Sequence, residues 1–400
     1  MSPKATKHIS MATLVPALAG VVLAAMPLAA RAGTLTVVHN FTGGSDGGSP
    51  VDGLMMNAKG TLFGTTSAGG TAALGAVFQM SGRGTQKVLH SFQGGADGAT
   101  PNGGVIDDAK GTLFGTTTAG GAAGAGTVYS LRGQTETVLY SFAGGTSDGM
   151  APQAGLVQDA SGNLYGTTTA GGAAGNGTVF ELVAPKSRKG AWAEKVLYSF
   201  GTGTDGAAPV GRVVLDTAGN LYGTTSLGGA SGYGTVFQLK PGATWTETIL
   251  HSFQNTDDGN TPYAGLVADA SGNFYGAATA GGNNGGGTIF ELSPSNGSFT
   301  FAVLASVPGW GVSGTFRDIL VQPNGVIYAT THCDGTNSAG SIYELTLSGG
   351  VWTYTELYDF TGGSDGQYSI SNLVLKGSKL YGTTIGGGAN GAGTVYAFTP

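Results

Sequence analysis

One irregular stretch of the chain combines several side-chain types that can bind a ligand or move a proton. It contains Trp310, Arg317, His332 and Asp334. A guanidinium can hold a carboxylate through two parallel hydrogen bonds, and an imidazole can accept a proton near neutral pH. An isolated His-Cys-Asp run without a triad partner is more typical of a binding site, or of a repeat that has drifted, than of catalysis. We interpret the four residues as candidate ligand-binding positions and assign no catalytic residue.

Six aspartates that each precede a glycine form a second, more regular set. They are Asp46, Asp97, Asp148, Asp205, Asp258 and Asp365. Carboxylates beside flexible backbone carbonyls could bind Ca²⁺, which takes six to eight oxygen ligands. Each of these links offers one clear carboxylate, however, and an aspartate in a turn commonly accepts hydrogen bonds from backbone N–H groups two residues further on. We favour the turn role, keep Ca²⁺ as the alternative, and assign no other cofactor.

Three histidines share one position with three tyrosines when the chain is divided into its repeats. The histidines are His39, His90 and His251, and the tyrosines are Tyr140, Tyr198 and Tyr358. Exchange between imidazole and phenol indicates a packing position with one polar tip, which argues against ligation or catalysis there.

All these residues are positioned by a repeat that runs through the chain. A strand–glycine–strand unit begins at Leu62, Leu113, Leu164, Leu221, Phe274, Ile327 and Leu380, with successive copies 51 to 57 residues apart. In the third copy, four strands are predicted at residues 155–159, 163–168, 178–182 and 194–200. Four short antiparallel strands in a repeat of about 50 residues are typical of one blade of a β-propeller. The links that carry the aspartates and the sixth-repeat residues should all lie on one face.

The two ends of the repeat region are offset by one strand. Residues 37–41 match the fourth strand of a repeat but precede the first complete copy, and the last copy stops after its third strand. We therefore predict an all-β fold, a seven-bladed propeller of four-stranded antiparallel blades, closed by residues 34–41 pairing into the last blade. Residues 33–400 would form this single domain. The alternative is an open solenoid, which would need polar caps that neither end shows.

The first 32 residues have the pattern of a secretory signal peptide. Lys4 and Lys7 precede an apolar run, and 30–32 reads Ala-Arg-Ala before Gly33. The alternative is an uncleaved membrane anchor, but Pro16 and Pro27 interrupt the run. We expect an exported protein, periplasmic or extracellular, with no membrane span after cleavage. Its single cysteine, Cys333, leaves no internal disulfide to stabilise it.

The charge of the chain argues against nucleic acid as a partner. The formal net charge is −6, only 10% of residues are charged, and no cluster of lysine and arginine appears. Nucleic-acid binding depends on such clusters, so we expect no nucleic-acid partner. Hydrophobic content of 40% argues against disorder despite 76 glycines. We expect a monomer.

Four motifs that recur in order carry a family resemblance. In one copy they are residues 196–200, 205–206, 221–225 and 234–237. This pattern resembles the GloVer tandem repeat of exported bacterial proteins with variable surface anchors, and it covers residues 34–400. The resemblance implies export and carries no assigned activity. We expect a binding or structural module for carbohydrate or another extracellular polymer; the alternative is a secreted polysaccharide hydrolase or lyase with its site in the sixth repeat.

Overall fold

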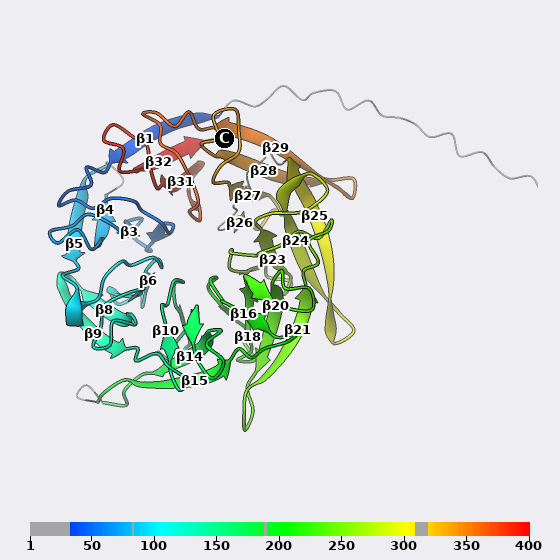
Figure 1. Ribbon diagram of the computed structural model, residues 1–400. Helices are drawn as coiled ribbons and strands as arrows, with labels where there is room; N and C mark the ends of the chain where they lie inside the picture. Colours follow the sequence, from blue (N-terminus) through cyan, green and yellow to red (C-terminus); the bar gives the residue numbers. More distant parts are fainter. Residues whose placement is uncertain (1–32, 82–83, 188–189, 309–318) are drawn as a thin grey trace, which may run out of the picture.

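The computed structural model describes residues 33–81, 84–187, 190–308 and 319–400. The predicted signal peptide, Trp310 and Arg317 therefore lie outside the described residues. Seven four-stranded antiparallel sheets surround one central axis (Figure 1). The described part of the chain has no helix of the length and hydropathy that a membrane span requires. The predicted seven-bladed β-propeller is confirmed.

Each blade is a meander of four strands, numbered outward from the axis. Blade 1 consists of β2 (Met55–Met56), β3 (Leu62–Thr66), β4 (Ala76–Met80) and β5 (Gln86–Ser91). Blade 2 consists of β6 (Ile106–Asp107), β7 (Thr112–Thr117), β8 (Thr127–Arg132) and β9 (Thr135–Ser141). Blade 3 consists of β11 (Val157–Gln158), β12 (Leu164–Thr168), β14 (Thr178–Val183) and β15 (Ala193–Ser199). Blade 4 consists of β17 (Val214–Leu215), β18 (Leu221–Thr225), β20 (Thr235–Lys240) and β21 (Thr246–Ser252).

The remaining blades follow the same plan, with longer outer strands in blades 5 and 6. Blade 5 consists of β22 (Val267–Ala268), β23 (Phe274–Ala278), β24 (Gly285–Ser295) and β25 (Ser298–Pro308). Blade 6 consists of β26 (Ile319–Val321), β27 (Ile327–Thr330), β28 (Ser341–Ser348) and β29 (Val351–Asp359). Blade 7 consists of β30 (Val374–Lys376), β31 (Lys379–Thr384), β32 (Thr394–Thr399) and β1 (Thr34–Asn40). Two short ladders join β10 (Gly149–Met150) to β13 (Ala170–Gly171) and β16 (Gly206–Ala207) to β19 (Leu227–Gly228), and one 3-10 turn, η1, spans Gly95–Asp97.

The chain ends meet in blade 7, where blue β1 lies beside red β32 (Figure 1). The register pairs Thr34 with Thr399 and Asn40 with Thr394. The predicted closure by the N-terminal strand is confirmed.

In six blades the second strand has a glycine that is required by an aromatic ring on the third strand; blade 6 has Ala329 at this position. A Cβ added at Gly64 would lie 2.6 Å from Cζ of Phe78. The same close approach joins Gly166 to Phe180 and Gly223 to Phe237. Real Cβ atoms do not come that close, so the recurring Leu-Tyr-Gly-Thr-Thr pattern reflects packing inside the blade.

Threonines in the second strands connect six of the seven blades to the next; blade 5 has Ala277 at this position. The hydroxyl group donates to a backbone carbonyl just before the first strand of the following blade, over 2.8–3.4 Å. The donor–acceptor pairs are Thr65–Gly103, Thr116–Ala154, Thr167–Gly211, Thr224–Ala264, Thr330–Ser371 and Thr383–Asp52. These bonds run around the axis and hold the residues before each first strand at the centre of the ring. The first strands are accordingly shorter than predicted: β11 has two residues where five were expected, because the preceding residues leave the ladder.

Candidate functional site

The six recurring aspartates fix the turns that contain them. In five links the carboxylate accepts the backbone N–H of the residue four positions earlier, namely Thr42, Gln93, Gly201, Gln254 and Thr361. Asp148 accepts the N–H of Ala143 instead. The predicted turn role is therefore observed, with one correction. The main donor N–H precedes the aspartate in the sequence instead of following it, because the link folds back and places the carboxylate beside the end of the outer strand.

The same carboxylates bind the polar tips of the outer-strand rings. Tyr140, Tyr198 and Tyr358 each donate a hydroxyl hydrogen bond of 3.0 Å to the aspartate of their link. His251 contacts Asp258 at 3.0 Å through Nε2. Burial lowers the pKa of His39 and of His251, and the neighbouring aspartates oppose that shift. The histidines thus occupy the packing position with one polar tip that their exchange with tyrosine indicated.

In the sixth repeat, Asp334 is a buried structural acceptor. Asp334 is only 2% exposed. Its carboxylate accepts a hydrogen bond from Thr331 Oγ1 and another, at 2.7 Å, from the hydroxyl of Tyr343. His332 stacks on Tyr368 with the ring centroids 4.5 Å apart. Burial and the nearby Asp334 raise the pKa of the Cys333 thiol, which disfavours a thiolate nucleophile. The structure therefore ties Asp334 into the blade, and it leaves Trp310 and Arg317 outside the described residues.

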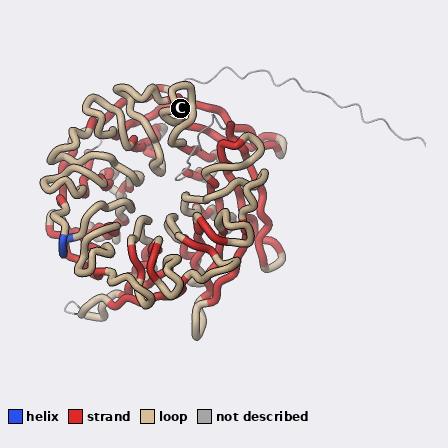
Figure 2. The backbone as a smooth tube through the Cα atoms, in the orientation of Figure 1, coloured by secondary structure: helices blue, strands red, loops and turns tan. Residues whose placement is uncertain are grey.

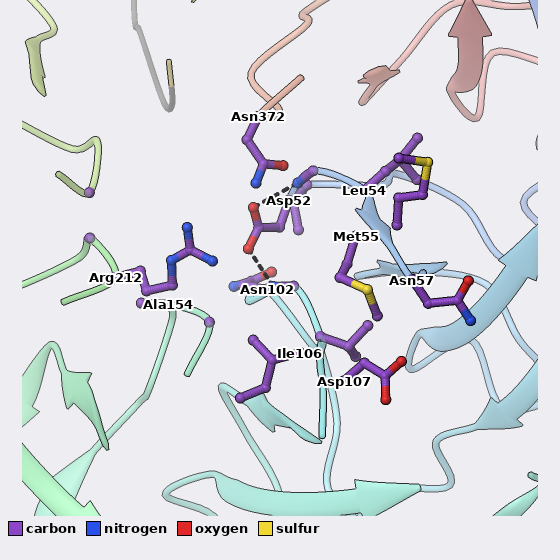
Figure 3. A pocket seen from close by; sticks show the side chains of 18 of the residues that line it. Asp52, Leu54, Met55, Asn57, Asn102, Ile106, Asp107, Ala154, Arg212 and Asn372 are labelled. Atoms are coloured by element: carbon purple, nitrogen blue, oxygen red, sulfur yellow. Dashed lines mark hydrogen bonds between the residues drawn. The ribbon is translucent and has the colours of Figure 1, made fainter. Parts of the chain in front are cut away.

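A cavity of about 610 Å³ lies on the propeller axis and is lined mainly by the segments that precede the first strands. Asp52, Asn102, Arg212 and Asn372 converge on it from four different blades (Figure 3). Ligand sites typically occupy roughly 300–1,000 Å³ and combine a few convergent polar groups with an apolar wall. Met55 and Ile106 supply part of that wall. This axial cavity is the best-formed candidate site among the described residues.

Two side chains enter the cavity where the repeat otherwise has glycine. The position in question lies two residues before the start of each first strand. It is glycine in four blades: Gly53, Gly104, Gly155 and Gly265. Blade 4 has Arg212 there and blade 7 has Asn372. Each larger residue lies against a glycine of a neighbouring blade, Arg212 against Gly155 and Asn372 against Gly53. The glycines thus make room for two of the polar side chains that line the cavity.

Asp52 is held in place by backbone donors. Its carboxylate accepts hydrogen bonds from the N–H of Gly53 at 2.7 Å and from the N–H of Gly104 in the next blade (Figure 3). Asn372 Oδ1 is buried and has no hydrogen-bond partner among the described residues. Arg212 is exposed to the cavity, and no ion pair joins it to another residue of the described ranges. The guanidinium of Arg212 is therefore available within the cavity, whereas Oδ1 of Asn372 is an unpaired acceptor buried against Gly53.

Further charges lie at one end of the cavity. Lys59 and Lys110 come from the hairpins between the first and second strands of blades 1 and 2, and Asp107 lies at the end of β6. Three cations thus line one cavity in a chain with a net charge of −6. Arg212 and Asn372 were not predicted as site residues from the sequence. The available signal was the replacement of a recurring glycine by arginine or asparagine. It becomes visible only when the repeats are aligned on their second strands.

Comparison with known proteins identifies the repeat and the fold. The family model described as the Gloeobacter/Verrucomicrobia repeat matches residues 19–180 and 132–317. A Bacteroides uniformis protein provisionally named a 6-phosphogluconolactonase is 14% identical, with a TM-score of 0.53 over 83% of this chain and 89% of its own. A Bacteroides fragilis protein of the same provisional name is 17% identical, with a TM-score of 0.51 over 84% and 87%. No curated protein matches the sequence. At these identities the solved structures support the propeller fold alone.

Proposed function

This chain belongs to the Gloeobacter/Verrucomicrobia repeat family, and from that premise we propose that it is an exported binding module whose axial cavity holds an acidic carbohydrate. Export rests on the signal-peptide pattern of residues 1–32. The observation that carries the proposal is Arg212, a guanidinium in the cavity at a position where four other blades have glycine.

The cavity lining favours a ligand with hydroxyl groups and a carboxylate. Arg212 can form two parallel hydrogen bonds with a carboxylate, and Lys59 and Lys110 add positive charge nearby. Asn102 and Gln153 offer both donors and acceptors, which is the chemistry that sugar hydroxyls require. Arg212 forms no ion pair within the described ranges, so its charge is available to a ligand.

A calorimetric titration of the mature chain, residues 33–400, with oligogalacturonate tests this proposal. Neutral galactan oligosaccharides of the same length serve as the comparison ligand. Replacing Arg212 by glycine, the residue found in four other blades, should weaken binding of oligogalacturonate about tenfold to a hundredfold, because one charged hydrogen-bonding group contributes roughly 1.5–3 kcal/mol. Lys195→Ala is the control, since it removes one cation from an outer strand at 60% side-chain exposure, away from the axis.

Two results would argue against the proposal. Equal affinity for the acidic and neutral oligosaccharides, or unchanged affinity in Arg212→Gly, would remove Arg212 from the binding site. The same samples should be assayed for new reducing ends and for unsaturated products. Binding without turnover would exclude the hydrolase or lyase alternative for this polymer.

A further inference from the structure

A second cluster of chemically versatile side chains lies at the rim of the ring, where blade 1 meets blade 2. It consists of His90 on β5, Asp97 in η1 and Glu136 on β9, and their ligand-type atoms all lie within 4.8 Å of one another. His90 Nε2 is 3.0 Å from Oδ1 of Asp97 and 3.2 Å from Oδ2. Figure 2 shows η1 as the blue turn at the periphery, away from the axial cavity. The cluster is thus independent of the proposed carbohydrate site.

The equivalent positions at other blade junctions each lack one of these three side chains. The sets are His39–Asp46–Gln86, Tyr140–Asp148–Glu194, Tyr198–Asp205–Glu247 and His251–Asp258–Phe301. At the last of these, Phe301 stacks on His251 at 3.7 Å and occupies the place of the glutamate. Among these five junctions, only that between blades 1 and 2 combines imidazole, aspartate and glutamate.

At the junction of blades 1 and 2, Glu136 lies near the carboxylate of Asp97, and no hydroxyl group of the described residues bridges the two. At the Tyr198 junction, the phenol hydroxyl lies 3.0 Å from Asp205 and 3.5 Å from Glu247, so it sits between the two carboxyl groups. At the His90 junction, Asp97 already accepts the N–H of Gln93 at 2.6 Å. Oε1 of Glu136 is buried and has no partner among the described residues, as is also true of Oε1 of Glu194 and of Glu247, so what distinguishes this junction is the imidazole in place of the phenol. Two facing carboxyl groups and an imidazole nitrogen leave a position that a cation can neutralise.

We propose that this junction binds one divalent transition-metal ion, with Zn²⁺ as the best-suited ion, through His90, Asp97 and Glu136. Imidazole nitrogen and carboxylate oxygen are both zinc ligands, and with three protein ligands a water molecule would complete the tetrahedron. At Zn–N and Zn–O distances of about 2.1 Å, tetrahedral ligand atoms are about 3.4 Å apart. The observed spacing of up to 4.8 Å therefore requires the ligand atoms to approach by at most about 1.4 Å, which side-chain rotation can supply. Ca²⁺ fits less well, because it prefers six to eight oxygens.

Zinc titration of the tag-free mature chain, after dialysis against a chelator, tests the site. Isothermal titration should show one Zn²⁺ per chain, and Co²⁺ should give the visible absorption bands of a tetrahedral ion. Glu136→Gln and His90→Tyr should each weaken Zn²⁺ binding more than about tenfold, since even the loss of a group that only supports a ligand has that effect. Tyrosine is the residue that the repeat itself places at the His90 position in other blades, so His90→Tyr should fold; Glu136→Gln keeps the side-chain shape.

Matched controls come from the other junctions. Glu194→Gln removes the equivalent glutamate beside a tyrosine, and His251→Tyr removes the equivalent histidine beside a phenylalanine. Both should bind Zn²⁺ as the unmodified chain does. Absence of binding at about 100 μM Zn²⁺, a concentration that corresponds to a free energy near −5.5 kcal/mol, would overturn the proposal. Equal weakening by Glu194→Gln and Glu136→Gln would overturn it as well.

Discussion

Val37 of β1 is paired with Tyr396 of β32, so residues from opposite ends of the described chain complete one blade. Two further contacts strengthen this closure. Phe41, which follows β1 and is fully buried, packs edge-on against Phe78 of blade 1 at 5.3 Å. Thr383 of blade 7 donates a hydrogen bond to the carbonyl of Asp52 in blade 1. The N-terminal strand therefore joins the last blade to the first.

Deleting residues 34–40 should destabilise the whole propeller, because it exposes the edge of β32 and separates blade 7 from blade 1. Phe41→Ala alone should cost about 3–5 kcal/mol, the usual cost of removing a buried phenylalanine. Thermal melting followed by circular dichroism measures both effects. Leu227→Ser, which alters an exposed side chain, should leave the midpoint nearly unchanged. An unaltered melting curve for the deletion would contradict the closure.

The inter-blade threonines should contribute individually to stability. Thr224→Val keeps the side-chain volume but leaves the carbonyl of Ala264 without its 2.8 Å donor. We expect a loss of about 1–2 kcal/mol in the free energy of unfolding, measured by urea titration. Thr353→Val, at an exposed position in the β28–β29 hairpin, is the control and should change stability by less than about 0.5 kcal/mol. Blade 5 has Ala277 at the position of Thr224, so the fold itself should survive.

Two outer-strand glutamates should make stability depend on pH. Burial, followed by the charge of an aspartate in the preceding link, raises the pKa of Glu194 and of Glu247 to about 7. The unfolded chain releases these protons near pH 4.5, whereas the folded chain retains them up to about pH 7. The folded state then binds more protons in this interval, so stability falls as pH rises from about 4.5 to about 7 and is level above that.

The double variant Glu194→Gln/Glu247→Gln should remove this slope. The difference in melting temperature, double variant minus unmodified chain, should be larger at about pH 8 than at about pH 5, because glutamine cannot ionise. Calorimetry in the presence of a chelator measures the difference without a contribution from bound metal. Parallel pH profiles of the two proteins would show that these carboxyl groups do not set the slope. The comparison also cancels the opposite trend expected from His39 and His251, whose lowered pKa values destabilise the folded state in acid.

Asp52 should stabilise the contact between blades 1 and 2 in addition to shaping the cavity. Its carboxylate joins the N–H groups of Gly53 and Gly104, and hydrogen bonds to a charged acceptor contribute roughly 1.5–3 kcal/mol. We expect Asp52→Ala to lower the urea midpoint by a corresponding amount. Asp257→Ala makes the same charge change at an exposed link position and is the control. Equal midpoints for the two variants would show that these hydrogen bonds do not stabilise the contact between the blades.

The repeat and the closure could be predicted from sequence because each depends on local patterns. Strand alternation, the Gly-Thr-Thr ending of the second strand and the displaced residues 37–41 are all visible along the chain. The role of the recurring aspartates was also predictable, since their donors lie within five residues. The partners of the outer-strand histidines are seven residues away, beyond a turn whose path the sequence does not specify.

By itself, then, the sequence determined the number of blades, their order and the strand that closes the ring, because hydrophobic periodicity and turn residues act over a few positions. Only the tertiary structure decided which side chains converge. Asp52 and Asn372 are 320 positions apart yet lie together at the axis, and Arg212 reaches the same cavity from a third blade. Such convergence depends on the closure of the ring and on glycines such as Gly53 that leave room for side chains of the next blade. Likewise, the His90–Asp97–Glu136 cluster forms only because the packing of blade 1 against blade 2 brings β9 beside η1.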